Sequence, residues 1–382
     1  MKIGFLITYF YPRLGGAESN CYYLARELVT RKHEVHVFCS DARTKDETLG
    51  GIHVHRAREL LRIKYYLAWY PALYASLKQT KLDILHVHGL GFPQHDSFVA
   101  RLRQDFPTLK LVCTPHGPFM ALSSYSLLGK IVKRVYTTLV KRTIPWYDRF
   151  IQVNTTQWKW MTQEYAIPRE KIRYVPNGIP LEAFAVPART VVSRLTNKYD
   201  LSGKTILTYV GRIQRYKGLD QVIAALPVLV KKDHSLVFVA IGKDHGDHAR
   251  LVALAQSLGV EKHVVFTGML PDVEMRALLS LSEIFVFPSQ WEAFGIVLLE
   301  AMAQGNAIVA SDTEGTTFLR SQGMRGLLFT YGNKHQCAEK LEKLLSSPKQ
   351  LRSMQQKNKQ VARKFLWSSA ALQLEQVYRE LV

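Results

Sequence analysis

The chain has 382 residues, of which 47% are hydrophobic and 21% charged, and this globular composition predicts two domains with adequate cores. Its formal net charge of +20 creates a field that attracts anionic lipid, nucleic acid or phosphorylated substrates. No uncharged apolar run reaches the roughly 18 residues of a membrane-spanning helix, and the four scattered cysteines predict reduced thiols with neither a disulfide nor a zinc site.

The first half of the chain alternates short β-rich runs with helical periodicity, a pattern typical of a parallel sheet flanked by helices. The apolar N-terminus is interpreted as a strand rather than a signal peptide, because no small-residue cleavage site follows it. The apolar stripe of Cys21, Leu24, Ala25 and Leu28 predicts a helix over residues 17–30. Strands are expected at 2–8, 34–39, 84–88, 110–114, 149–153 and 172–175.

A second series of the same kind follows a weakly patterned linker at 180–190. Its expected strands are 205–210, 235–241, 263–267, 284–288 and 307–311, and its expected helices 218–230, 248–258, 274–281 and 295–304. The sequence therefore predicts an α/β protein with two Rossmann-like, doubly wound domains, residues 1–183 and 190–364. A C-terminal helix at about 365–382 is a candidate for packing back on the first domain. Ligands bind beyond the carboxyl ends of parallel strands, so two such domains facing each other would share one cleft.

The strongest functional motif is Glu-Ala-Phe-Gly-Ile-Val-Leu-Leu-Glu at residues 292–300, directly after an expected strand. Gly295 permits close backbone approach at a helix N-terminus, where free N–H groups and the helix dipole favour a phosphate. Glu292 precedes the helix and is expected to face the cleft, while Glu300 is placed to accept hydrogen bonds from ribose hydroxyls. A core helix with one exposed glutamate would give the same pattern.

A basic motif lies between a strand and a helix of the same domain. It contains Gly211, Arg212, Lys217 and Gly218. Arginine offers a planar fork to phosphate oxygens and lysine a mobile point charge, so the pair can neutralise a diphosphate leaving group. A solvated basic loop is the alternative, but the position of this loop beside the glutamate motif favours phosphate binding.

Three weaker motifs lie in the first domain. Gly15 and Gly16 join the first strand to the first helix, where they would let the backbone approach a phosphate or sugar, or merely allow a turn with positive φ. His116 ends a strand and could bond a sugar hydroxyl, although an isolated histidine is more often structural. Asn177 belongs to a Pro-Asn-Gly turn near the linker.

Taken in order along nearly the whole chain, these motifs resemble those of the family 4 retaining glycosyltransferases of the GT-B fold. The resemblance implies that Arg212 and Lys217 bind the donor diphosphate, Glu300 the ribose and Glu292 the transferred sugar, with His116 contacting that sugar from the opposite domain. It also implies retention without a metal or other cofactor, by front-face attack in which the leaving phosphate helps to deprotonate the acceptor. The remaining expected substrate-binding residues are Gly15, Gly16, Asn177, Gly211, Phe294, Gly295, Ile296 and Val297.

The implied donor is a UDP- or GDP-linked hexose and the implied acceptor a glycan or a lipid-linked molecule, with no role for nucleic acid. After Ser311 and Asp312 the sequence departs from the family, which commonly has a Gly-Gly pair where this chain reads Thr313-Glu314-Gly315. The details of that loop are left open by the resemblance.

Two segments of the basic first half bear on the acceptor. Residues 64–78 are aromatic and bounded by lysines, which suits either a membrane interface or the core. Residues 130–142 interleave Lys and Arg with aliphatic side chains, and no acidic residue falls between Asp105 and Asp148. A peripheral enzyme on the cytoplasmic face of an anionic membrane and a domain helix with a solvated cationic face explain this pattern equally well.

Other functions fit the sequence less well. The charge alone would suit a nucleic-acid-binding protein, but no RNP-like or helix-turn-helix signature accompanies it. A dehydrogenase would need a G-x-G-x-x-G after the first strand, and an epimerase or phosphorylase on the same architecture is the nearer alternative. Neither residues 244–248 nor 312–314 supply a full set of metal ligands, and His86 and His88 are expected to be packed.

Overall fold

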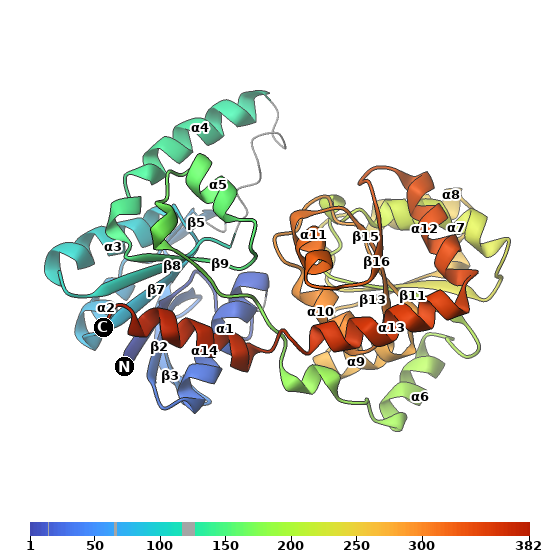
Figure 1. The fold of residues 1–382 in the computed structure, drawn as a ribbon, viewed down its shortest axis with the longest axis horizontal. Coiled ribbons are helices and arrows are strands. Elements are labelled where there is room, and N and C mark those ends of the chain that lie inside the picture. Colours follow the sequence, from blue (N-terminus) through green and yellow to red (C-terminus); the bar gives the residue numbers. More distant parts are fainter. Residues whose placement is uncertain (14, 65–66, 117–126) are drawn as a thin grey trace. The chain divides into compact units, whose positions relative to one another are not determined.

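The computed structural model describes residues 1–13, 15–64, 67–116 and 127–382 (Figure 1). The chain forms two compact units. Unit 1 contains Met1–Gly178 and Trp367–Val382, and unit 2 contains Ile179–Leu366. The sequence placed the ends of the two domains at 183 and 190, but the segment between these positions belongs to unit 2, where the Gln304 amide donates to the backbone oxygen of Ala185 at 3.1 Å.

The described strands of unit 1 form an eight-stranded sheet in the order β10-β9-β8-β7-β1-β2-β4-β3. Pairing is parallel except between β3 and β4, which form an antiparallel pair at one edge. The strands are β1 (Lys2–Leu6), β2 (Glu34–Asp41), β3 (Lys45–Leu49), β4 (Ile52–Arg58), β7 (Ile84–His88), β8 (Lys110–Thr114), β9 (Arg149–Gln152) and β10 (Ile172–Tyr174). A separate antiparallel pair consists of β5 (Leu61–Lys64) and β6 (Leu67–Trp69).

Helices cover this sheet because its central strands are buried along their whole length, as β7 is. They are α1 (Gly16–Thr30), α2 (Leu73–Thr80), α3 (Pro93–Asp105), α4 (Leu127–Lys141), α5 (Trp158–Gln163) and α14 (Trp367–Arg379), with 3-10 turns at Ile144–Trp146 and Arg169–Lys171. The C-terminal helix α14 packs on α1, where the Trp367 and Tyr23 rings stack at 5.6 Å and Arg31 forms an ion pair with Glu375.

Unit 2 is built on a parallel sheet with the strand order β13-β12-β11-β14-β15-β16. Its strands are β11 (Thr205–Val210), β12 (Leu236–Ile241), β13 (Val264–Gly268), β14 (Ile284–Phe287), β15 (Ala307–Ser311) and β16 (Gly326–Phe329). Its helices are α6 (Arg189–Lys198), α7 (Leu219–Val230), α8 (His248–Ser257), α9 (Asp272–Leu281), α10 (Ile296–Ala303), α11 (Glu314–Ser321), α12 (Lys334–Leu345) and α13 (Pro348–Ala362), with 3-10 turns at Leu181–Phe184, Arg215–Lys217 and Glu261–His263.

The topology of each unit fixes where a ligand can bind. In unit 2 the first strand, β11, lies between β12 and β14, so the order of the sheet reverses there. In unit 1 the first strand, β1, lies between β2 and β7 in the same way. Doubly wound sheets bind ligands at the carboxyl ends of the strands beside this switch point. The predicted fold of two Rossmann-like α/β domains is therefore confirmed.

The structure shows the local form of two segments that the sequence left open. Residues 180–190, the predicted linker, contain a 3-10 turn at Leu181–Phe184 and the start of α6. For residues 64–78 the sequence allowed either a membrane interface or the core, and the described part contributes mainly to the core, since Tyr70, Leu73 and Leu77 are at most 2% exposed. Trp69, which is 48% exposed, is its main surface aromatic among the described residues.

Candidate active site

Two loops meet at the switch point of unit 2, one after β11 and one after β14. Lys217 comes from the first loop and Glu292 from the second, and the Lys217 Nζ lies 3.1 Å from a Glu292 carboxylate oxygen. The lysine side chain is only 10% exposed, and its ammonium lies 5.0 Å from the Tyr216 ring centroid and 5.5 Å from that of Phe287. A nearly buried cation is thus held at the sheet edge where the topology places a ligand.

Arg212, the second predicted cation, lies on the same loop and is exposed. Its guanidinium donates to the Tyr216 hydroxyl at 2.8 Å, and the Tyr216 ring stacks on Trp291 with centroids 4.4 Å apart. The Tyr209 hydroxyl donates to the backbone oxygen of Arg212 at 3.0 Å. Tyr216 and Trp291 were missed in the sequence, although each stands next to a predicted site residue.

The glycines of these loops allow backbones to approach closely. Gly218 has φ +68°, and a Cβ there would lie 2.2 Å from the backbone oxygen of Pro288 in the second loop. Gly211, with φ +152°, packs against Gly242, whose Cβ would lie 1.9 Å from the Gly211 oxygen. Side chains at these positions would force the loops after β11, β12 and β14 apart.

The helix that follows Glu292 presents its N-terminus at the same edge. Gly295 precedes α10 with φ +84°, and within the described residues no side chain caps the helix. The N–H groups of Ile296 and Val297 are thus placed to bind an anion, whereas the Leu298 N–H donates to the Gly295 oxygen at 2.9 Å. Ile296 and Val297 form the partly exposed first turn, and Phe294 is buried beneath it.

Glu300 lies one turn further along α10. Burial raises the pKa of its carboxyl group to about 7; the nearby Asp272 raises it further and Arg276 opposes the shift. Near neutral pH this group is therefore divided between its protonated and ionised forms. In either form its oxygens can accept hydrogen bonds, and the ionised form is the stronger acceptor.

In the loop at Thr313-Glu314-Gly315, the glycine is required by close packing against a neighbouring backbone. A Cβ on Gly315 would lie 2.8–2.9 Å from the backbone atoms of Phe294, and the Gly315 N–H donates to the Glu292 oxygen at 2.9 Å. Thr313 caps α11 through a reciprocal contact with Thr316. The Thr-Glu-Gly segment thus contacts the backbone of residues 292–294, which we call the glutamate loop.

In unit 1 the loop after β1 carries the predicted Gly15 and Gly16. Gly15 precedes α1 in an extended conformation with φ −138°, and neither Gly15 nor Gly16 has positive φ. The alternative interpretation, in which these glycines serve a turn with positive φ, is therefore wrong. A Cβ on Gly15 would lie 2.6 Å from a Glu18 carboxylate oxygen, whereas one on Gly16 would meet nothing within 4 Å. Open space above Gly16 leaves its backbone accessible to a ligand.

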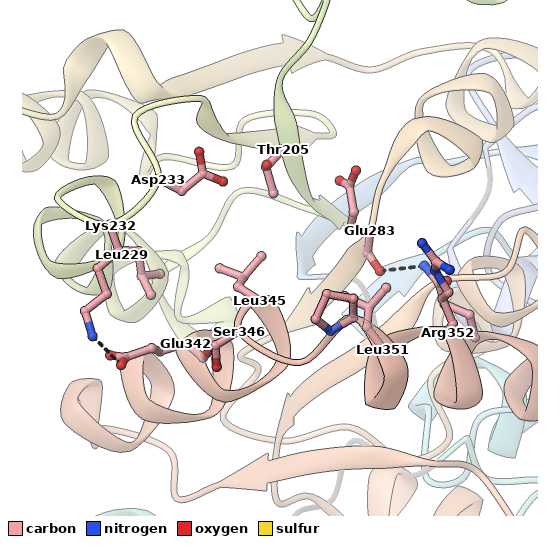
Figure 2. Close-up of a pocket in the computed structure, with 12 residues that line it drawn as sticks. Thr205, Leu229, Lys232, Asp233, Glu283, Glu342, Leu345, Ser346, Leu351 and Arg352 are labelled. Carbon is pink, nitrogen blue, oxygen red and sulfur yellow. Dashed lines mark hydrogen bonds and ion pairs between the residues drawn. The ribbon is translucent and has the colours of Figure 1, made fainter.

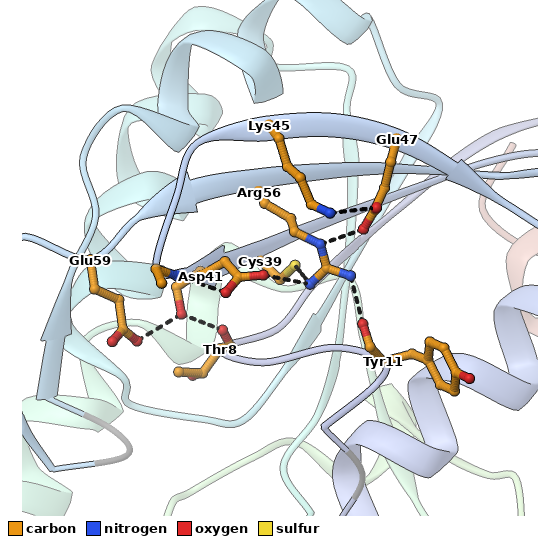
Figure 3. A network of polar contacts seen from close by, with 10 residues as sticks. Thr8, Tyr11, Cys39, Asp41, Lys45, Glu47, Arg56 and Glu59 are labelled. Carbon is orange, nitrogen blue, oxygen red and sulfur yellow. Dashed lines mark hydrogen bonds and ion pairs between the residues drawn. The ribbon is translucent and has the colours of Figure 1, made fainter.

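This loop is held in place by Arg56 of β4, which is 4% exposed (Figure 3). Its guanidinium donates to the backbone oxygen of Tyr11 at 2.5 Å and to Glu47 at 2.6 Å, and it lies 3.3 Å from Asp41. Asn177, the other predicted residue of unit 1, is buried. Its side-chain oxygen accepts a hydrogen bond from the amide of Asn20 in α1 at 2.7 Å.

His116 follows β8 with φ +56°, and its side chain is partly buried. Its Nε2 lies 2.7 Å from the Nδ1 of His88 at the end of β7. Burial lowers the pKa of His116 to about 3, so the imidazole is neutral near pH 7. Residues 117–126, including the glycine of the predicted Pro-His-Gly motif, lie outside the described residues.

The predicted residues thus form two groups. Unit 2 brings together Gly211, Arg212, Lys217, Glu292, Phe294, Gly295, Ile296, Val297 and Glu300, and unit 1 contains Gly15, Gly16, His116 and Asn177. The roles assigned to these residues stay predictions.

Two other features do not form a site. Within the described ranges no cluster of three or more His, Cys, Asp or Glu residues could hold a metal ion, and Asp244 instead accepts backbone N–H groups of residues 246–248. A hollow of about 530 Å³ lies among Thr205, Glu283 and Arg352 (Figure 2). It is at the amino ends of β11 and β14, away from the edge that binds ligands in this fold.

All four cysteines are free and buried. Among the described helices, none is both long enough and apolar enough to span a bilayer.

Comparison with known proteins identifies the class of molecule. The chain superposes along its whole length on sucrose-phosphate synthase from Thermosynechococcus elongatus, with a TM-score of 0.80, 20% identity and 98% of that chain covered. Anabaena HepE in complex with UDP and glucose gives a TM-score of 0.78 at 18% identity, with both chains fully covered. The protein has the GT-B fold of glycosyltransferases.

The sequence comparisons give the family. Residues 14–183 match the family described as Glycosyltransferase Family 4, and residues 194–361 match Glycosyl transferases group 1. Spore coat protein SA of Bacillus subtilis is 26% identical over the full length of both chains. A phosphatidyl-myo-inositol mannosyltransferase of Mycobacterium leprae is 24% identical, with 99% of this chain and 96% of the relative covered. The chain belongs to the family 4 glycosyltransferases.

Proposed function

We propose that this glycosyltransferase transfers a hexosyl unit with retention of anomeric configuration, from a UDP- or GDP-linked sugar to a glycan or lipid-linked acceptor, without a metal. The observation that carries the proposal is the nearly buried Lys217 ammonium, which pairs with Glu292 on the loop that leads into α10, a helix whose N-terminus no side chain caps among the described residues. A cation and free backbone N–H groups at one switch point are suited to the diphosphate of a sugar nucleotide.

Each of these groups has a role in the proposed reaction. Lys217 and Arg212 neutralise the charge that develops on the leaving diphosphate as the glycosidic bond breaks. Glu292 binds hydroxyls of the transferred sugar, and Glu300 binds the ribose. His116 of unit 1 contacts a sugar hydroxyl as a neutral imidazole, and the leaving phosphate accepts the proton of the attacking acceptor hydroxyl.

What similar proteins bind or act on supports the donor and acceptor classes. HepE has been crystallised with UDP-glucose, and this supports UDP-glucose as the first donor to test. The mycobacterial relative is a phosphatidyl-myo-inositol mannosyltransferase, which supports a lipid-linked acceptor and a mannosyl donor as the next pair.

The test is a panel of UDP- and GDP-hexoses assayed for hydrolysis and for transfer, with the anomeric configuration of the product read by NMR. Arg212→Ala and Glu292→Ala should each lower kcat by about 10²–10³-fold. Arg215→Ala is the matched control, because this exposed arginine lies on the same loop three residues away. Activity should survive EDTA.

Three results would reject the proposal. Wild-type rates in Arg212→Ala would show that Arg212 does not bind the diphosphate. A product with inverted anomeric configuration would show that transfer does not proceed with retention. A product in which the donor sugar is only isomerised, or released by phosphate, would favour the epimerase or phosphorylase alternative.

The proposed acceptor also bears on the exposed surface of α4. Four aliphatic side chains of this helix are 53–62% exposed, namely Ile131, Val132, Val135 and Leu139, and Arg134 and Lys141 lie exposed between and beside them. The opposite side is anchored by Lys133, whose ammonium pairs with Glu164 at 2.6 Å. Exposed aliphatic and cationic side chains on one helix suit an anionic lipid surface.

We therefore propose peripheral binding to anionic membranes through α4. The wild-type protein should sediment with phosphatidylglycerol vesicles at low salt and less so at high salt. A Val132→Asp, Val135→Asp double variant should stay in the supernatant. Val228→Asp on α7, where Val228 is 49% exposed, is the control. Equal sedimentation of the double variant and the wild type would exclude α4 as the binding surface.

A further inference from the structure

The imidazoles of His88 and His116 form a hydrogen-bonded pair inside unit 1. The two facing nitrogens are 2.7 Å apart and the two rings stack with centroids 4.9 Å apart. His88 is 1% exposed, and its ring is also packed against Phe5 at 5.4 Å and His86 at 4.8 Å. The position of His88 is therefore fixed by the core, and it can fix that of His116.

The hydrogen-bond inventory of the pair decides where the protons lie. Burial lowers the pKa of both imidazoles, so both rings are neutral near pH 7. At the contact, one nitrogen must therefore donate and the other must accept. The second nitrogen of His88, Nε2, is buried and has no partner among the described residues. If His116 donated to His88, this Nε2 would carry a buried N–H without an acceptor, and orphaned N–H groups are rarer than orphaned acceptors. The favoured arrangement has the proton on His88 Nδ1, donated to His116 Nε2.

This arrangement sets the tautomer of His116. Its Nε2 becomes the acceptor, so the remaining proton must lie on its Nδ1. Among the described residues that Nδ1 has no hydrogen-bonding partner. His116 would then offer an N–H donor, rather than a lone pair, to the oxygen atom of a ligand hydroxyl.

His86 does not perform the same task, although it lies on the same strand. Its Nδ1 lies 2.6 Å from the Tyr378 hydroxyl of α14 and its Nε2 lies 2.6 Å from the Thr114 hydroxyl, so both ring nitrogens are occupied by other partners. Only His88 of this strand contacts His116 through a hydrogen bond among the described residues.

We propose that His88 is a positioning residue of the glycosyl transfer site: its Nδ1–H donates to His116 Nε2 and so holds His116 in the Nδ1–H tautomer, with that N–H directed to a hydroxyl of the transferred sugar. The part that concerns the sugar rests on the proposed function. The part that concerns the tautomer does not, and it can be measured without any substrate.

The first experiment reads the tautomers in the free, full-length protein labelled with ¹⁵N-histidine, by long-range ¹H–¹⁵N correlation at pH 7.5. The His116 resonances are assigned by their loss in His116→Gln. We expect a protonated Nδ1 in His116, and a protonated Nε2 in the wild type would overturn the proposal.

Two substitutions of His88 separate positioning from packing. The amide nitrogen of asparagine can occupy the place of Nδ1 and donate. His88→Asn should therefore keep the His116 tautomer and retain most of the wild-type turnover. Phenylalanine keeps a ring but removes the donor, so His88→Phe should shift His116 toward the Nε2–H tautomer. It should also lower kcat by about ten- to a hundredfold, with a small change in donor KM.

His95→Gln is the matched control, because it also replaces a buried imidazole of unit 1, one whose Nε2 lies 2.8 Å from the Tyr70 hydroxyl. It should leave the His116 tautomer unchanged. An unchanged tautomer in a folded His88→Phe variant would refute positioning by His88. A tautomer that shifts as expected while the wild type transfers no sugar would refute the proposed function and leave the histidine pair intact.

Discussion

Replacement of Gly315 by alanine tests whether the glutamate loop depends on the loop after β15. The added Cβ would lie 2.8 Å from the Phe294 carbonyl carbon and oxygen and 2.9 Å from its nitrogen, all of them backbone atoms. Ordinary contacts of this kind begin near 3.4 Å, so the Phe294 backbone must move by about half an ångström. Overpacking of this kind costs about 1–3 kcal/mol of unfolding free energy.

The movement should be transmitted to Glu292, whose backbone oxygen accepts the Gly315 N–H at 2.9 Å. A displacement of this size at a site residue lowers kcat/KM by up to about 100-fold. Thermal unfolding measures the stability of the variant, and transfer kinetics with the best donor measure the displacement of the glutamate.

Gly326→Ala is the matched control in the same unit. A Cβ at Gly326 would meet its nearest neighbour, Ile308, at 3.4 Å, which is an ordinary contact. This variant should lose little stability and no activity. Unchanged stability and turnover in Gly315→Ala would show that the glutamate loop does not rest on Gly315.

Three further predictions concern charged groups. Because burial raises the pKa of Glu300 to about 7, donor KM should rise as the pH falls from about 8 to 6, and Glu300→Gln should abolish this dependence. Burial raises the pKa of Glu375, but hydrogen bonds from Arg379 and Arg31 outweigh it and hold the pKa at about 2. Glu375→Gln should therefore lower unfolding free energy at pH 7 by about 2–3 kcal/mol, and the difference from wild type should shrink as the pH falls from about 4 to 2 in urea titrations. Arg56→Met should lower unfolding free energy by about 3 kcal/mol, measured the same way, because it leaves Glu47 and Asp41 without their buried partner.

The sequence predicted the central strands well because their burial leaves a clear signal. The strands at 84–88, 110–114, 205–210 and 307–311 were placed without error, since parallel strands buried on both faces read as short apolar runs. The strands between residues 45 and 69 were missed. Lys45–Leu49 reads Lys-Asp-Glu-Thr-Leu, and an edge strand of this kind is held by pairing to β4 rather than by apolar burial.

The candidate site was only partly accessible to sequence reasoning. The order of the motifs located Arg212, Lys217 and Glu292 on loops that the topology brings together. The stack of Tyr216 on Trp291 depends on which two loops become neighbours, and no pattern within either loop carries that information. The contact of His88 with His116 likewise joins residues 28 apart. The sequence predicted a sugar contact for His116 and a packed position for His88, but nothing in it paired the two.

The return of the chain to unit 1 has a consequence for biosynthesis. Residues 179–366 are contiguous and can fold as soon as they leave the ribosome, whereas unit 1 lacks α14 until Trp367 and the residues after it have been made. Until then α1 exposes the Tyr23 face and leaves Arg31 without Glu375. The half of the molecule that is synthesised first should thus be the last to mature, and nascent chains stalled before residue 367 should remain protease-sensitive in their N-terminal part.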